Sequence, residues 1–101
     1  MLLYNVTVKI DKGIEAEWLD WMKSKHIPDM MCTGMFVSCR ICRVLDQDEE
    51  NKSTYTFLYE CESRNKLDKY FKEFATALRA DASNRFGNNF QITRSVLEVV
   101  E

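Results

Sequence analysis

The chain has 101 residues, the length of one small domain with a single hydrophobic core. Its apolar fraction of 46% and charged fraction of 30% are ordinary for a globular protein. The net charge of −2 supplies no positive field for a phosphate backbone, so we expect no nucleic-acid partner. No apolar run approaches the roughly 20 residues that span a bilayer, and the first residues lack the features of a signal peptide. We therefore expect a cytoplasmic protein that does not contact membranes.

The first third of the chain reads as a strand followed by a helix. Residues 2–10 alternate in the manner of a β-strand, and from Ile14 to Met31 the apolar residues recur at helical spacing. Trp18, Trp21 and Met22 lie on one stripe of that helix. Because Pro28 cannot continue a helix interior, the main helix is predicted to end near His26, with one further turn at residues 29–32.

Two strands are predicted next, at residues 35–45 and 53–61, joined by the acidic turn 46–52. If Leu45 lies opposite Ser53, one face of this hairpin is strongly apolar, and we assign that face to the helices. It holds Val37, Cys39, Ile41, Tyr55, Phe57, Tyr59 and Cys61. The turn lacks the glycine and the bidentate glutamate of an EF-hand, which favours a solvated tip over a calcium site.

The last third of the chain reads as a helix followed by a strand. Residues 64 to about 82 are predicted to be helical, with Ser63 as N-cap and a buried stripe along one side. That stripe consists of Leu67, Tyr70, Phe71, Phe74, Ala75 and Leu78. A turn at residues 87–89 leads into a strand over residues 90–100. Phe90, Ile92, Arg94 and Val96 alternate there with Gln91, Thr93, Ser95 and Leu97, and the alternation leaves open which set is buried.

The order of these elements, βαββαβ, is that of a ferredoxin-like α+β fold, and residues 1–101 form one such domain. We predict a four-stranded antiparallel sheet in the order 4-1-3-2 with both helices on one face. Trp18, Trp21, Phe71 and Phe74 are expected to be buried beneath the helices. The other side of the sheet, which we call the open face, is left without a cover.

The open face is the main candidate site. Its candidate ligand-binding residues are Asn5, Thr7, Ser38, Arg40, Thr56, Glu60 and Arg94. Leu3, Val44, Leu58 and Val96 give the same face an apolar character that favours a homodimer. Two interpretations of the polar residues stay open. They form either an arginine–glutamate network that fixes the dimer, or a cavity for a small anionic or aromatic molecule.

His26 is the chain's only histidine, and it is a candidate general base or metal ligand. Met22, Met30, Met31 and Cys32 are soft donors nearby in sequence, but the predicted break at Pro28 separates them from one helical face. We therefore expect His26 to cap the end of a helix, and we expect no metal site and no cofactor.

The cysteines fit reduced thiols rather than a disulfide scaffold. Cys39 and Cys42 have the spacing C-x-x-C, but strand side chains three positions apart point to opposite faces. The two thiols are therefore not expected to share a metal ion or to form a redox disulfide.

Three segments resemble a family of bacterial proteins of unknown function, of Bacteroidetes type, in the dimeric α+β-barrel superfamily. They are residues 3–8 (LYNVTV), residues 18–28 with the tryptophan pair, His26 and Pro28, and residues 94–99 (RSVLEV). The resemblance covers nearly the whole chain and implies a ferredoxin-like protomer that dimerises through its open face. The superfamily includes cofactor-free monooxygenases, lactone isomerases, haem-degrading enzymes and proteins without known activity. The family supplies no catalytic residues to carry over.

Two functional hypotheses follow. The first is a homodimeric structural or small-molecule-binding module. The alternative is an enzyme of the monooxygenase or isomerase type that acts on a small aromatic or anionic metabolite, with His26, Arg40, Glu60 and Arg94 as candidate catalytic residues. A cavity lined by Arg40, Glu60 and Arg94 would favour the enzyme, whereas a fully packed face would favour the module.

Overall fold

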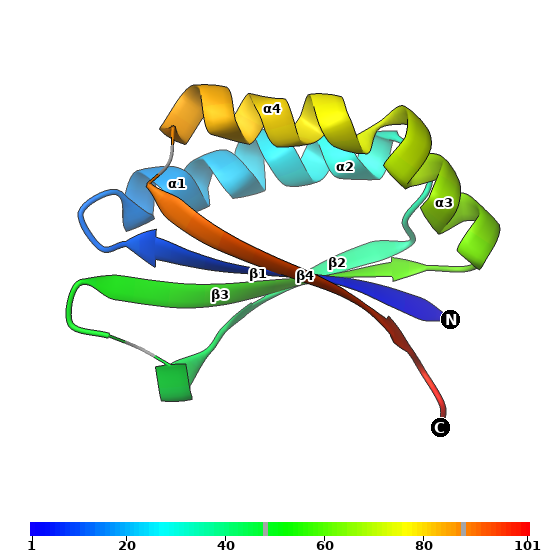
Figure 1. Ribbon diagram of the computed structural model, residues 1–101, viewed down its shortest axis with the longest axis horizontal. Helices are drawn as coiled ribbons and strands as arrows, with labels where there is room; N and C mark the ends of the chain where they lie inside the picture. The colour runs from blue at the N-terminus through cyan, green and yellow to red at the C-terminus, as the bar shows by residue number, and fades with distance from the viewer. Residues whose placement is uncertain (48, 88) are drawn as a thin grey trace.

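An antiparallel sheet with its α-helices on one side forms the protein in the computed structural model (Figure 1). The structure describes residues 1–47, 49–87 and 89–101, so Asp48 of the hairpin tip and Asn88 of the last turn lie outside the described residues. Within them the sheet has four strands in the order β2-β3-β1-β4, which is the predicted order read from the other edge. The strands are β1 (Leu2–Asp11), β2 (Ser38–Arg43), β3 (Lys52–Cys61) and β4 (Phe90–Glu98).

The predicted register of the hairpin is confirmed. Arg43 pairs with Tyr55 and Cys39 with Tyr59, which is the register that places Leu45 opposite Ser53. The strand β2 is shorter than predicted, because Phe36 turns into the core before the pairing with β3 begins. Val37, assigned to the covered face by alternation, is for that reason 52% exposed.

The first helical arm runs from residue 15 to residue 32 without the predicted break. It consists of α1 (Glu15–Trp21), the π-helical segment η1 (Met22–His26) and α2 (Ile27–Cys32). Within η1 the Ile27 amide donates to the Met22 carbonyl, five residues back. A proline ring clashes with the carbonyl four residues earlier in an α-helix, and the wider π turn relieves this clash, so Pro28 is accommodated. The predictions that the helix ends at His26, and that His26 caps it, are therefore wrong.

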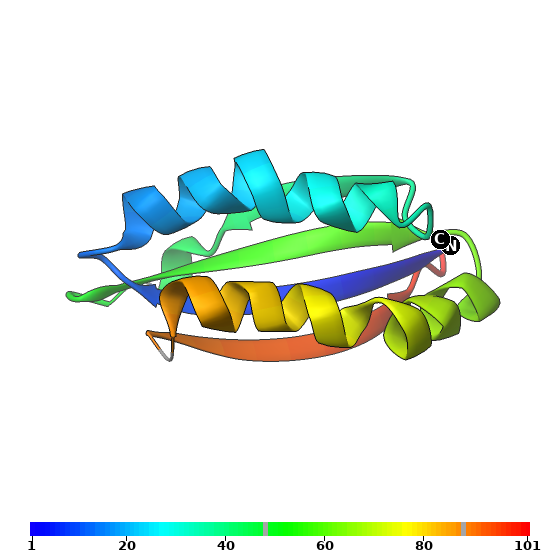
Figure 2. The ribbon, with the colours of Figure 1, turned by 90° about the horizontal axis from the view of Figure 1, so that it is seen from above.

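The second helical arm is interrupted where the sequence predicts continuity. Its parts are α3 (Arg64–Glu73), capped by the Ser63 hydroxyl, and α4 (Ala75–Phe86). Between them Phe74 has φ −122° and ψ −32°, outside helical geometry. Seen from above, the first arm lies over the β2 and β3 side of the sheet, and α4 lies over β1 and β4 (Figure 2).

The core lies between the helices and the sheet. Trp18 is 2% exposed and packs against Tyr55 and Phe57, with ring centroids 5.5 and 5.7 Å away. A second aromatic cluster, at the other end of the sheet, consists of Tyr4, Phe36, Tyr59, Tyr70 and Phe71. Trp21, Phe71 and Phe74 are half-buried against this core rather than fully buried.

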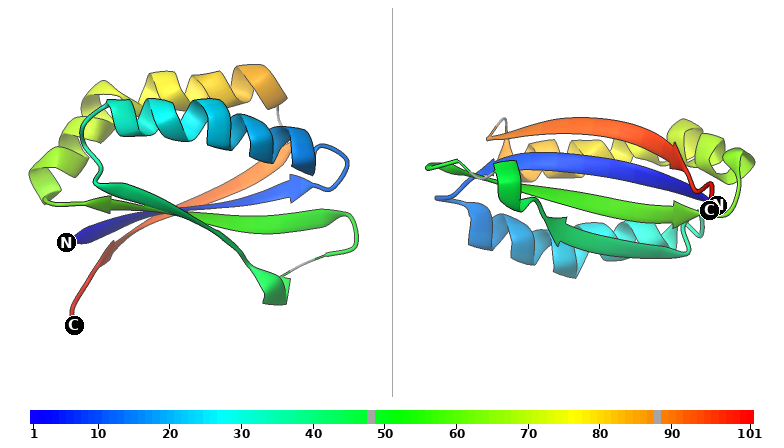
Figure 3. Two further views of the ribbon diagram at one scale, coloured as in Figure 1. Left: turned by 180° about the vertical axis from the view of Figure 1, so that it is seen from behind. Right: turned by 90° about the horizontal axis from the view of Figure 1, so that it is seen from below.

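The open face of the sheet is uncovered apart from the 3-10 turn η2 (Leu45–Gln47) at one end (Figure 3). The register of β4 settles which of its faces is covered: Leu97 pairs with Leu3 on the open face, and Val96 pairs with the core residue Tyr4. The placement of Val96 on the open face is thus wrong, and Leu97 takes that position. In the described part of the chain, no helix is long and apolar enough to cross a membrane.

A candidate ligand pocket between the helices and the sheet

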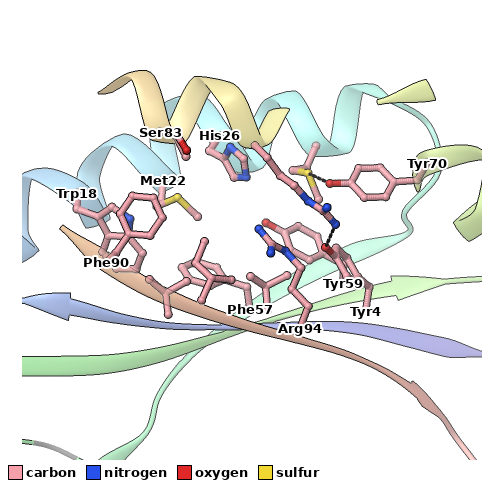
Figure 4. A pocket seen from close by; sticks show the side chains of 16 residues that line it. Tyr4, Trp18, Met22, His26, Phe57, Tyr59, Tyr70, Ser83, Phe90 and Arg94 are labelled. Atoms are coloured by element: carbon pink, nitrogen blue, oxygen red, sulfur yellow. Dashed lines mark hydrogen bonds between the residues drawn. The ribbon is translucent and has the colours of Figure 1, made fainter. Parts of the chain in front are cut away.

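A cavity of about 80 Å³ lies between the two helical arms, above β1 (Figure 4). Its floor comes from β1, β3 and β4 and its walls from both arms, so residues far apart in sequence meet there. The lining residues are largely aromatic or aliphatic: Tyr4, Val6, Val8, Trp18, Met22, Met30, Phe57, Tyr59, Tyr70, Ala82, Phe90 and Ile92. The polar lining residues are His26, Arg79, Ser83 and Arg94.

The cavity exists because the side chains that face it from α4 and β1 are small. Ala82 and Ser83 face the cavity from α4, where larger residues would fill it. Val6 lies in a central strand on the covered face and is nonetheless only half-buried, because the cavity is above it. Interiors are otherwise close-packed, so such a space between well-packed aromatic clusters is a candidate binding site.

Two arginines form the rim of the cavity. The Arg79 Nη2 donates to the Tyr4 hydroxyl at 3.1 Å, and the Arg94 side chain rises from β4 toward the helices (Figure 4). Both guanidinium groups lower the pKa of the Tyr70 phenol, although burial, the larger effect, raises it. Among the described residues, neither Arg79 nor Arg94 has a carboxylate within 4 Å. The rim is therefore cationic, and no acidic side chain of the described residues pairs with it.

The phenols of the cavity are neutral hydrogen-bonding groups. The Tyr70 hydroxyl donates to the Met30 sulfur at 3.3 Å. Burial raises the pKa of both Tyr59 and Tyr70, so neither loses its proton near neutral pH. The Tyr4 hydroxyl accepts from Arg79 and keeps its own hydrogen for donation, which adds a donor beside the guanidinium groups.

His26 faces the same cavity from the π-helical segment (Figure 4). Its ring stacks on Trp21, with centroids 5.4 Å apart and planes inclined by 27°, and Trp21 in turn contacts the edge of Phe86. Burial lowers the pKa of His26 below its ordinary value of 6.5, against the opposing influence of Asp29 and Asp81. The imidazole is therefore neutral at pH 7 and has a free lone pair.

The sequence-predicted residues of the open face bond mainly to one another. The Asn5 side-chain oxygen accepts from Thr56, the Thr7 and Thr56 hydroxyls are 3.1 Å apart, and the Asn5 amide donates to Ser95 at 3.4 Å. Their hydrogen-bonding capacity is thus largely used within the sheet, as expected of structural groups.

The proposed grouping of Arg40, Glu60 and Arg94 is wrong. Arg40 is exposed on the open face, opposite Leu58. Glu60 accepts from the Ser38 hydroxyl at 2.9 Å on that face. Arg94 pairs with Val6 and lies on the covered face. The register between β4 and β1 is shifted by one residue from the one that would place Arg94 on the open face. The sheet itself therefore separates Arg94 from Arg40 and Glu60.

The C-x-x-C thiols lie on opposite faces, as predicted. Cys39 pairs with Tyr59 on the covered face and Cys42 with Thr56 on the open face. All four cysteines are free, and burial raises the pKa of the Cys39 thiol to about 11. In the described residues no three histidine, cysteine or acidic side chains gather as metal ligands.

Arg79 is the site residue that the sequence reasoning missed. It continues the spacing of Phe71 and Ala75 by four residues, so a charged side chain occupies the apolar stripe of the second arm. Arg94 likewise interrupts the row Phe90, Ile92 and Val96. A cation in an apolar row was the signal available for both.

The βαββαβ order, the single helical layer and the open face define a ferredoxin-like α+β fold. Residues 1–100 match the model of one family, and the chain belongs to it: Domain of unknown function (DUF4286). No curated protein matches the chain.

Solved structures share this fold at low sequence identity. A dimeric ferredoxin-like protein from an uncultured marine organism superposes with a TM-score of 0.76 at 12% identity, over 99% of this chain and 95% of that one. An EthD family protein from Bacillus halodurans superposes with a TM-score of 0.68 at 10% identity, over 99% of this chain and 100% of that one. SnoaB, a cofactor-independent oxygenase from Streptomyces nogalater, gives 0.60 at 14% identity, over 99% and 94%. Identities this low establish the fold alone.

Proposed function

We propose that the protein binds a small molecule with an aromatic or apolar body and an anionic group, in the cavity beneath the helices. The observation that carries this proposal is the pair Arg79 and Arg94 at the rim of an apolar cavity, without carboxylate partners among the described residues. An unpaired guanidinium beside a low-dielectric space favours a carboxylate or phenolate ligand, because charge-assisted hydrogen bonds are strongest there.

Binding is tested with phenylacetate against its uncharged amide, phenylacetamide. Methionine methyl groups labelled with ¹³C report the site, since Met22 and Met30 line the cavity and Met1 and Met35 do not. We expect phenylacetate to shift the Met22 and Met30 signals selectively. A hydrogen bond to a charged group contributes about 1.5–3 kcal/mol, so Arg79→Gln or Arg94→Gln should weaken binding roughly 10- to 100-fold.

Arg40→Gln is the matched control, because it removes an arginine from the open face instead. We expect it to leave phenylacetate binding unchanged. The opposite pattern, with loss in Arg40→Gln and none in the cavity variants, would move the site back to the open face. Equal binding of phenylacetate and its amide would remove the anionic part of the proposal.

We also propose that two copies of the chain pair through their open faces. Leu3, Leu58 and Leu97 lie on this face, and Leu97 is 42% exposed in the single chain. The marine ferredoxin-like proteins of the same fold are dimeric. Sedimentation should give twice the chain mass of 11.9 kDa, and Leu58→Arg should shift the protein toward the monomer. A single 11.9 kDa species for the unaltered protein would refute this pairing.

An enzymatic role is a second candidate function. The specific observation in its favour is that the neutral imidazole of His26 lines the same cavity as the two arginines. SnoaB, which shares the fold, is a cofactor-independent oxygenase, so this architecture is compatible with chemistry that needs no cofactor.

A further inference from the structure

The position of His26 is fixed by two features of the first helical arm. The π turn of η1 ends at His26 and carries the backbone past Pro28 without ending the helix. The Trp21 ring, itself held against Phe86, stacks on the imidazole. A side chain held by backbone and ring contacts is oriented before a ligand arrives, and π turns inside α-helices often occur at functional sites.

Charged groups surround His26 from both arms and from the sheet. Lys25 and Asp29 are its neighbours on the first arm, and Asp81 acts on it from α4. Arg79 and Arg94 complete the rim of the same cavity. Burial outweighs the two carboxylates and keeps the imidazole neutral at pH 7. A neutral base with a pKa somewhat below the operating pH is suited to accept a proton from a ligand.

We propose that His26 is the proton-transfer group of this cavity and that the protein catalyses the enolisation of a small aromatic 2-oxo acid. The inference rests on the proposed function, because it places the ligand in the cavity with its anionic end at Arg79 and Arg94. What it adds is a reaction, a residue that carries it and a class of substrate.

The step is balanced without a further reactant. The C–H bond next to the ketone breaks, and its proton goes to the unprotonated ring nitrogen of His26. The electron pair of that bond forms a C=C bond, and the carbonyl π pair moves to oxygen. Arg79, Arg94 and the Tyr4 hydroxyl are positioned to stabilise the resulting enolate. Return of the proton to the oxygen gives the enol and regenerates neutral His26.

The lining sets the class of substrate. Aromatic side chains surround most of the cavity, which favours a ring over an extended polar chain. The cavity volume of about 80 Å³ is smaller than the roughly 150 Å³ of an engineered cavity that binds benzene. The enclosed space is therefore too small for a whole ring, and part of the ring stays with its carboxylate in the open mouth of the cavity, beside the guanidinium groups.

Phenylpyruvate in D₂O is the probe, with loss of the methylene signal in the ¹H NMR spectrum as the measure of exchange. We expect the protein to accelerate exchange over buffer. His26→Gln should lower kcat/KM for exchange about 10²- to 10⁴-fold, the usual contribution of a general base. For the unaltered protein kcat/KM should fall as the pH drops through the pKa of His26, and this inflection should be absent in His26→Gln. Lys23→Gln, an exposed change in the same π segment, is the matched control.

Three outcomes contradict the inference in distinguishable ways. Equal exchange rates for the unaltered protein and His26→Gln would remove the role of His26. Exchange no faster than in buffer, while phenylacetate still shifts the Met22 and Met30 methyl signals, would remove catalysis and leave the binding function intact. Absence of both effects would remove the proposed function as well. Those methyl signals also report whether His26→Gln is folded.

Discussion

The two faces of the sheet use their polar side chains differently. On the open face Asn5, Thr7 and Thr56 hydrogen-bond to one another within the sheet. On the covered side, Arg94 of β4 and Arg79 of α4 lie at a cavity, and no carboxylate of the described residues is within 4 Å of either. Polar groups whose bonds are made internally stabilise a structure, whereas cations left unpaired beside an apolar space are available to a ligand. The comparison moves the candidate site from the face that sequence favours to the opposite one.

The largest effect is expected from the core beneath the helices. Trp18→Ala removes a 2%-exposed side chain that packs on Tyr55 and Phe57, and should lower the free energy of unfolding by about 3–5 kcal/mol. Thr7→Val removes one hydroxyl of the open face and should cost no more than about 1.5 kcal/mol. Urea titration measures both. Similar losses in the two variants would mean that the faces do not differ in this way.

The next largest effect is expected from Glu15, a half-buried carboxylate that bonds to two buried hydroxyls. Glu15 accepts from the Ser53 hydroxyl at 2.8 Å and from the Tyr55 hydroxyl, and it ties the start of α1 to β3. Glu15→Gln weakens these charge-assisted bonds and should lower the free energy of unfolding by about 1–3 kcal/mol. Glu17→Gln is the control, since Glu17 pairs with Arg85 at the surface and such pairs contribute about 0–1 kcal/mol. A larger loss for Glu17→Gln in urea titration would contradict the comparison.

Filling the cavity should weaken ligand binding while changing the free energy of unfolding only slightly. Ala82→Leu introduces a larger side chain where α4 lines the cavity, and should reduce phenylacetate affinity at least tenfold. The free energy of unfolding should change by less than about 2 kcal/mol, because the added atoms occupy existing space. Ala80→Leu, at an exposed position of the same helix, should leave binding unchanged. Unaltered binding in Ala82→Leu by NMR titration would place the ligand elsewhere.

The smallest effect is expected in how the free energy of unfolding depends on pH. The folded pKa of His26 lies below its ordinary value of 6.5, so in acid the unfolded chain binds this proton more readily than the folded protein does. The stabilisation is therefore complete above pH 6.5 and is lost as the pH falls through the folded pKa. Because His26 is the only histidine, His26→Gln should flatten the stability profile between pH 7 and pH 5. A profile of equal slope in both proteins would contradict the lowered pKa.

The strands and their register could be predicted because a period of two constrains every residue at once. One assumed pair, Leu45 opposite Ser53, gave the register of the paired residues from Ser38 to Arg43 correctly, although not the exposure of Val37. The continuity of the two helical arms was predicted wrongly. A break was predicted in the first arm, which is continuous, and none in the second, which is interrupted at Phe74. The rule against proline inside a helix is local and takes no account of a π turn, while the break at Phe74 has no local signal, since apolar spacing continues through it.

The site was harder to predict than the fold for reasons that particular residues show. Arg94 lies on an edge strand whose residues are mostly exposed on both sides, so the contrast that identifies a buried face is weak. Arg79 lies on α4, where few residues are buried and the amphipathic pattern fades. His26 was recognised as a candidate, but its place in the cavity depends on the π turn.

The π turn also sets the rotational phase of everything that follows it. An i→i+5 turn holds one residue more than an α turn, and one residue rotates an α-helix by about 100°. A regular α-helix with the same number of residues would turn Met30 away from the cavity, whereas the π turn absorbs one residue and keeps Met30 facing it. A single residue lost from Met22–His26 would be absorbed by closing the π turn to an α turn, and the residues that follow would keep their phase. Homologues with one residue fewer between Trp18 and Pro28 are therefore expected to keep the part of the cavity wall that Met30 forms.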